Sequence, residues 1–167
     1  MTINNLIKYK ILPFSMQPLI HKHVPKTTKE IFGQDEVIRK LKDFIVNFRK
    51  EKKNSALIYG PSGTGKTSSV YVIAKELDYE VIEVNASDMR NAEQINLKVG
   101  NAIKQKSLFA KGKIILVDEI DGLSGHEDRG GIQAITKLIE DSSYPIILTA
   151  TNPFDNKFSS LRSKSNL

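Results

Sequence analysis

Eight consecutive residues, Gly60 to Thr67, have the types and spacing that hold phosphate. They read Gly-Pro-Ser-Gly-Thr-Gly-Lys-Thr and lie between an apolar run and a helical pattern. Glycines let such a loop wrap so that its backbone N–H groups point at phosphate oxygens, with a helix N-terminus behind them. Lys66 would reach the β- and γ-phosphates of ATP, and the Thr67 hydroxyl would ligate Mg²⁺. The predicted nucleotide-binding residues are Gly60, Pro61, Ser62, Gly63, Thr64, Gly65, Lys66, Thr67 and Ser68.

Two adjacent acids follow a second apolar run. Residues 114–117 read Ile-Ile-Leu-Val and lead directly into Asp118 and Glu119. At the carboxyl end of a buried strand, Asp118 would hold Mg²⁺ through water, and Glu119 would point across the site and polarise the attacking water. A lone strand followed by an acid is common, but after a phosphate loop it predicts ATP hydrolysis.

Two asparagines follow other predicted strands. Asn152 comes just after residues 145–149, where its amide could sense the γ-phosphate and orient the water; on its own it would be an ordinary turn residue. Asn85 follows residues 79–84, and it could instead cap the next helix. We expect a catalytic role for both asparagines and keep the cap as the alternative for Asn85.

Composition excludes several other classes of protein. The 167 residues contain no cysteine and 3 histidines, which leaves no disulfide framework, thiol nucleophile or Cys-type zinc site. No apolar run is long enough to cross a bilayer, and Pro13 breaks the only N-terminal one, so we expect a cytoplasmic protein without a membrane partner. The net charge is +6, concentrated in residues 1–59 with 12 basic against 5 acidic side chains. This surplus suits a polyanionic partner or a solvated loop at a helix end.

Helical and extended patterns alternate along the chain. The apolar spacing predicts helices over 35–48, 67–77, 91–105 and 131–139, and strands over 56–59, 79–84, 114–117 and 145–149. Continuous apolar strands separated by helices predict an α/β fold, in which a parallel sheet is flanked by helices on both faces. Ligands of such sheets bind beyond the carboxyl ends of the strands, where the phosphate loop and both acids lie.

Together these motifs resemble the AAA+ ATPases, and four further segments are similar to the large subunits of archaeal replication factor C, the clamp loader. The segments are 83–88 (EVNASD), 118–125 (DEIDGLSG), 128–131 (DRGG) and 145–150 (PIILTA). With residues 90–95 (RNAEQI), they extend the resemblance over most of the chain, from about Pro18 to Arg162.

The resemblance implies that the chain uses ATP to load a sliding clamp onto primer–template DNA, together with clamp-loader small subunits. It implies that Asn85 withholds Glu119 until DNA binds, and that Arg90 faces the DNA backbone. Pro25 matches a family residue beside the adenine, whereas the arginine that usually precedes it is replaced by Val24. Arg162 stands where small subunits place an arginine that acts on a neighbour, a role that the resemblance does not imply for a large subunit.

The family pattern also predicts a domain organisation. We expect an N-terminal arm over 1–24, an ATPase core over 25–162 and a tail over 163–167, with the last core strand, the lid and the collar domains absent. The strand before the phosphate loop would then be a sheet edge, and hydrolysis by the isolated chain would be weak. Two alternatives stay open: an ATP-binding assembly subunit with little hydrolysis, and another AAA+ DNA machine such as a helicase loader or branch-migration motor.

Overall fold

The chain folds around a five-stranded parallel sheet. The computed structural model describes residues 25–86, 110–123 and 130–167. The sheet order is β2-β3-β4-β1-β5, and each neighbouring pair is parallel. The strands are β1 (Ser55–Tyr59), β2 (Tyr79–Asn85), β3 (Gly112–Asp118), β4 (Ile146–Ala150) and β5 (Ser165–Asn166). In this order β1, which leads into the phosphate loop, is separated from the acidic strand β3 by β4.

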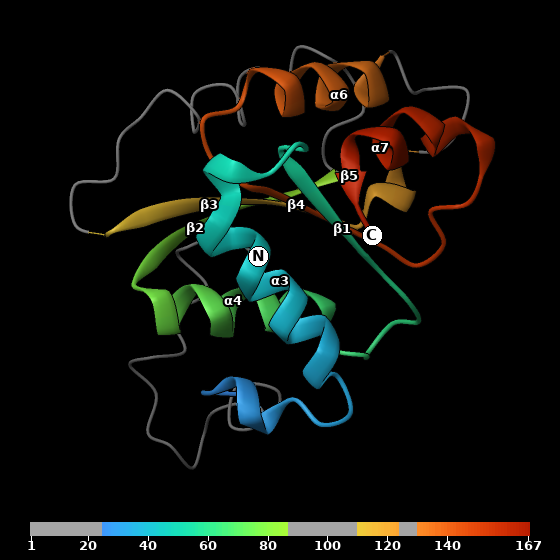
Figure 1. Ribbon diagram of the computed structural model, residues 1–167. Coiled ribbons are helices and arrows are strands. Elements are labelled where there is room, and N and C mark those ends of the chain that lie inside the picture. The colour runs from blue at the N-terminus through green and yellow to red at the C-terminus, as the bar shows by residue number, and fades with distance from the viewer. Residues whose placement is uncertain (1–24, 87–109, 124–129) are drawn as a thin grey trace, which may run out of the picture.

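Helices cover both faces of the sheet (Figure 1). One face packs against α3 (Asp35–Asn47) and α4 (Lys66–Leu77), and the other against α6 (Gly131–Asp141) and α7 (Ser159–Lys164). Short 3-10 turns precede or follow these elements at Thr28–Glu30, Phe48–Lys50, Ile120–Gly122 and Asn156–Phe158. The doubly covered parallel sheet expected from the sequence is thus confirmed.

The central strands are apolar because neither face meets water. All residues of β4 and all of β3 after Gly112 are buried. Side chains alternate along β3, so Ile114 and Leu116 contact the α3/α4 layer while Ile115 and Val117 contact the α6/α7 layer. Asp118 is two residues after Leu116, so its side chain lies on the same face of the sheet and points toward α4, the helix that begins in the phosphate loop.

The expectation that no strand flanks β1 on its far side is wrong. Ser165 and Asn166 form β5, in register with Ser55 and Ala56. Polar contacts hold this short strand: the Ser55 and Ser165 hydroxyls lie 2.7 Å apart, and the Lys53 ammonium donates to the Ser165 carbonyl at 2.9 Å. Two polar residues carry no hydrophobic periodicity, so the sequence pattern gave no sign of a strand.

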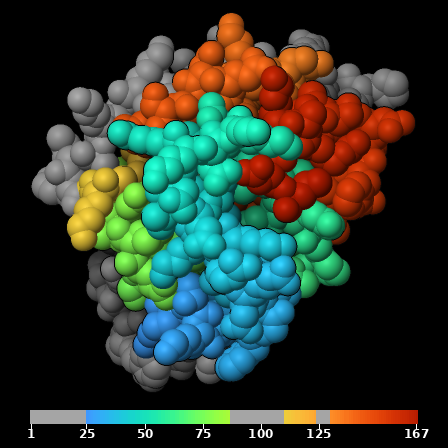
Figure 2. Space-filling view, in the orientation of Figure 1, coloured from blue at the N-terminus to red at the C-terminus, as the bar shows by residue number. Residues whose placement is uncertain are grey.

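The segment before α3 is fastened to α4 through one carboxylate. Figure 2 shows this N-terminal part of the described chain, from the 3-10 turn through α3, running as one continuous surface across the front of the molecule. Glu76 of α4 accepts hydrogen bonds from the backbone and hydroxyl of Thr28 at 3.0 and 2.9 Å and from the Lys42 ammonium at 2.8 Å. The Lys42 hydrogen bond, followed by the Thr28 N–H, lowers the pKa of Glu76 from 4.5 to about 2.

Glu76→Gln should therefore destabilise the fold at neutral pH by about 1 kcal/mol, a modest value because the pair lies at the surface. A carboxyl whose pKa is lower in the folded state stabilises above its unfolded pKa, and this stabilisation is lost as the pH falls toward the folded pKa. The difference between wild type and variant should thus shrink from pH 5 to pH 2. Urea unfolding at several pH values would measure it, with exposed Glu80→Gln as the charge control; a gap independent of pH would contradict the prediction.

In the parts of the chain that the structure describes, no helix is both long and apolar enough to cross a membrane.

Candidate nucleotide site

The phosphate loop connects β1 to α4 in the arrangement that the sequence predicted. Gly65 immediately precedes α4 with a φ of 87°, a left-handed conformation that favours glycine. A Cβ on Gly65 would also meet the Ile31 side chain at 3.4 Å, so the loop passes close to the segment before α3. The first residues of α4 line the cleft, and the first N–H groups of a helix have no acceptor within the helix, so they can donate to an anion.

The Lys66 side chain lies over its own loop. Its ammonium donates to the carbonyls of Gly60 at 2.7 Å and Pro61 at 2.9 Å. The Thr64 hydroxyl also donates to Pro61 O, at 2.9 Å. These contacts hold the loop's curvature and keep a positive charge at its mouth, where a phosphate oxygen could replace a carbonyl as the acceptor.

Thr67 and Asp118 meet across the site, although 51 residues separate them. The Thr67 hydroxyl donates to Asp118 Oδ1 at 2.9 Å and approaches Oδ2 at 3.1 Å. Asp118 is the last residue of β3 and is 9% exposed. A hydroxyl and one carboxylate suit Mg²⁺, which keeps several waters and also binds the nucleotide's phosphates. Among the described residues, no group of three or more His, Cys, Asp or Glu forms a denser metal site.

Glu119 occupies an unusual backbone conformation. Its φ of 56° and ψ of 55° lie in the left-handed region, which residues other than glycine rarely adopt. The exposed Glu119 follows the buried Asp118 directly, so the turn separates a carboxylate held in the sheet from one at the open side of the site. Backbone strain of this kind clusters at functional sites.

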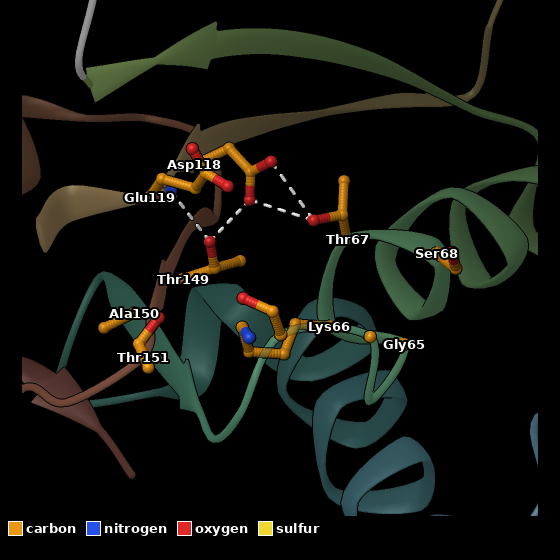
Figure 3. Close-up of a pocket in the computed structure, with 11 residues that line it drawn as sticks. Gly65, Lys66, Thr67, Ser68, Asp118, Glu119, Thr149, Ala150 and Thr151 are labelled. Carbon is orange, nitrogen blue, oxygen red and sulfur yellow. Dashed lines mark hydrogen bonds between the residues drawn. The ribbon is translucent and has the colours of Figure 1, made fainter. Parts of the chain in front are cut away.

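Thr149 is a site residue that the sequence analysis missed. It lies in β4, fully buried, beside the end of β3. Its hydroxyl donates to Asp118 Oδ1 at 2.5 Å and accepts the backbone N–H of Glu119 at 2.9 Å (Figure 3). The available signal was a single hydroxyl near the end of an otherwise apolar strand.

These residues surround one cleft of about 230 Å³. Phosphate-loop residues form one wall, and the ends of β3 and β4 form the other (Figure 3). The lining includes Ser62, Gly63, Gly65, Lys66, Thr67, Ser68, Asp118, Glu119, Thr149, Ala150 and Thr151. The structure thus brings the phosphate loop and both acids together, and the lining of the cleft also includes the predicted Ser68. Gly60, Pro61 and Thr64 lie in the same loop but do not line the cleft.

The remaining predicted residues have different placements. Asn85 ends β2 in register with Asp118, next to the site on the sheet. Asn152 is exposed and does not line the cleft; its side-chain oxygen accepts the Phe154 N–H at 3.0 Å and closes a turn. Pro25 also lies outside the lining, and Arg90 is outside the described residues. The catalytic, adenine and DNA roles of these four residues stay predictions.

A tyrosine on α4 joins the helix to β2 beside the site. The Tyr71 hydroxyl donates to the Glu83 carboxylate, two residues before Asn85 on the strand. Burial, together with this hydrogen bond, raises the pKa of Tyr71 well above its ordinary value. The hydrogen bond connects the strand that ends in Asn85 to the helix that begins at Lys66.

Arg162 is engaged within its own chain. Its guanidinium donates to the carbonyls of Pro153 and Asp155 and lies 6.0 Å from the centre of the Phe154 ring. These contacts hold the loop that follows β4 against α7. In this conformation Arg162 has a structural role in the loop.

Comparison with known proteins supports the resemblance seen in the motifs. A replication factor C large subunit from Nanoarchaeum equitans is 56% identical over 146 residues, 87% of this chain and 34% of the relative. One from Staphylothermus marinus is 44% identical over 150 residues, covering 89% of this chain and 36% of the relative. The chain therefore spans about a third of the length of the curated relatives it matches.

Solved structures share the fold at low sequence identity. A RuvB mutant from Thermotoga maritima superposes with a TM-score of 0.62 at 22% identity, over 87% of this chain and 48% of that one. The Aeropyrum pernix ORC1 protein, solved in complex with DNA, has a TM-score of 0.63 at 21% identity, over 89% of this chain and 46% of that one.

The family described as "ATPase family associated with various cellular activities (AAA)" matches residues 56–166, and the chain belongs to this family.

Proposed function

We propose that the chain binds Mg²⁺ and ATP and hydrolyses ATP as the core of a clamp-loader large subunit. The observation that carries the proposal is the convergence of Lys66, Thr67, Asp118 and Glu119 on one cleft. The replication factor C relatives support the clamp-loading role, and AAA membership supports ATP turnover. A cytoplasmic location stays a prediction.

The phosphates would lie along the loop and the first turn of α4. Backbone N–H groups there and the Lys66 ammonium, now on the Gly60 and Pro61 carbonyls, would donate to phosphate oxygens. Thr67 and Asp118 would hold Mg²⁺, the threonine by its hydroxyl oxygen and the aspartate through water. When bound, the ion neutralises charge on the phosphates during transfer.

Glu119 would act as the general base. It is exposed at the open side of the cleft, one residue beyond the predicted metal-holding aspartate. Its carboxylate would accept a proton from the water as the water oxygen bonds to the γ-phosphorus. The bond between the γ-phosphorus and the bridging oxygen would break, with its electron pair staying on the β-phosphate oxygen of ADP, and inorganic phosphate would be released. The two adjacent acids can serve different roles because Asp118 is buried and Glu119 is exposed.

Turnover would depend on partners. Small subunits, the sliding clamp and primer–template DNA would complete the assembly, with Arg90 contacting DNA phosphates and Asn85 responding to the DNA. We expect slow hydrolysis by the chain alone, because solvent access to the cleft would weaken the electrostatic stabilisation of the reacting groups.

ATP turnover with and without partners tests this function. The full chain would be assayed alone, then with small subunits, clamp and primer–template DNA from the same source. The proposal predicts stimulation of at least about tenfold when all components are present, in line with a general base brought into action by assembly. ATP-dependent assembly without added turnover would instead support the role of a binding subunit. The absence of both ATP-dependent assembly and added turnover would contradict the clamp-loader function.

A further inference from the structure

We propose that Thr149 is a positioning residue for hydrolysis, acting through both Asp118 and Glu119. This inference rests on the proposed function, because it assigns the two acids their roles. Thr149 lines the cleft, but its side chain is 0% exposed within β4, so the role proposed for it is exerted through the two acids that it contacts.

The Thr149 hydroxyl is used in both directions. A hydroxyl has one proton to donate and lone pairs that accept. Here the proton is donated to Asp118 Oδ1 at 2.5 Å, and an oxygen lone pair accepts the Glu119 N–H at 2.9 Å. One oxygen atom thus fixes the orientation of the carboxylate and the start of the turn that follows it.

The sheet places this hydroxyl beside both acids. Val117 of β3 is in register with Leu148 of β4, so the next residues, Asp118 and Thr149, are neighbours on the face covered by α4. The Thr67 hydroxyl approaches the same carboxylate from α4. Asp118 therefore accepts from two hydroxyl donors on different elements, and Thr149 is the one that remains when Thr67 turns its oxygen toward a metal ion.

The turn at Glu119 needs such support because its backbone is strained. A second contact spans the same two strand ends: the Asp121 carboxylate accepts the N–H groups of Thr151 at 2.5 Å and Asn152 at 3.3 Å. The two links cross between the strands in opposite directions, since Thr149 serves the β3 turn and Asp121 serves the loop after β4. Of the two contacts, the one made by Thr149 involves Glu119 directly, because the Thr149 hydroxyl accepts the Glu119 N–H.

Three variants separate positioning from packing. Thr149→Val keeps the branched shape and removes the hydroxyl, whereas Thr149→Ser keeps the hydroxyl. Thr136→Val removes a threonine hydroxyl from α6, where it donates to the Ile132 carbonyl at 2.8 Å, and serves as the matched control. We would measure kcat and KM for ATP, the Mg²⁺ concentration for half-maximal ATP binding, and the melting temperature.

Thr149→Val should lower kcat by about 10- to 100-fold and raise the Mg²⁺ midpoint at least about threefold, the range for groups that orient metal-holding and catalytic side chains. The KM for ATP should change little, because the phosphate loop is intact. Thr149→Ser and Thr136→Val should resemble wild type in both readouts. Wild-type kcat and Mg²⁺ midpoint in the valine variant, or equal losses in the serine variant, would overturn the proposal.

Two further measurements keep the inference separate from the proposed function. If Glu119→Gln retained full turnover, the base assignment would fail, yet the Mg²⁺ midpoint would still decide whether Thr149 orients Asp118. If Thr149→Val did not fold, amide hydrogen exchange in the wild-type chain would decide instead. The Glu119 N–H should be protected although the residue is exposed, and rapid exchange there would refute its bond to Thr149.

Discussion

Replacing Lys66 with alanine should weaken the binding of Mg²⁺–ATP more than tenfold and leave the fold intact. A charge-assisted hydrogen bond to phosphate contributes on the order of 1.5–3 kcal/mol. Residues 60–67 contain no other lysine or arginine that could replace Lys66. In the described structure the same group donates to the carbonyls of Gly60 and Pro61, and Pro61 is exposed to solvent. Water can replace that donor, so the free energy of unfolding should change little.

Lys75→Ala is the matched control, because it removes the same charge from the exposed side of the same helix. Titration of each variant with a fluorescent ATP analogue, together with thermal unfolding, would separate lost binding from lost folding. If both variants bound ATP as tightly as wild type, the phosphate-loop assignment would be wrong. If both lost affinity equally, the effect would be long-range charge attraction and not a contact with phosphate.

Much of the site could be predicted from the sequence because its parts are local. A phosphate loop is encoded by consecutive residues, and the strand before it and the helix after it are encoded by their own periodicities. Asp118 and Glu119 were identifiable for the same reason, since a buried strand that ends in acids is a contiguous pattern. That these parts converge follows from a general property of parallel sheets, whose carboxyl ends share one edge.

The element boundaries in the structure differ from the predicted ones by one or two residues. β3 begins at Gly112 and not Ile114, and it ends by including Asp118. The helix expected over 35–48 ends at Asn47, and a 3-10 turn continues to Lys50. The predicted helix over 91–105 lies outside the described residues. Apolar periodicity marks the buried centre of an element, and hydrogen bonding sets its ends.

What the sequence could not supply were contacts between strands. Thr149 acts on Asp118 because β4 is inserted between β1 and β3, and no local pattern encodes that order. β5 was missed because both of its residues are polar, and Ser165 is held to β1 by a hydroxyl contact with Ser55. For Asn152, the neighbouring motifs favoured a sensor role, although a turn residue was also compatible with its place after a strand; in the structure its amide oxygen closes a turn. A side chain's direction in a loop depends on hydrogen bonds that position along the chain does not specify.

Replacing Glu119 with glutamine should preserve ATP binding and lower hydrolysis by roughly 10²- to 10⁴-fold, the range for loss of a general base. Glutamine keeps the shape and the left-handed backbone but has no anionic oxygen to take the water's proton. Binding should survive because Lys66, Thr67 and Asp118, which would hold the phosphates and Mg²⁺, are untouched, and the Glu119 N–H still reaches Thr149. The variant should therefore accumulate with bound ATP.

Single-turnover hydrolysis measures this effect, with ATP binding followed in parallel. In an assembled loader the other ATP sites must first be inactivated, since their turnover would mask the loss. Exposed Glu80→Gln provides the matched control for the change in charge. Because the φ of 56° strains any residue other than glycine, melting temperatures of wild type and Glu119→Gln should agree, which ties the lost turnover to the carboxylate and not to the turn. Unchanged hydrolysis in Glu119→Gln would show that the general base is another group at the cleft.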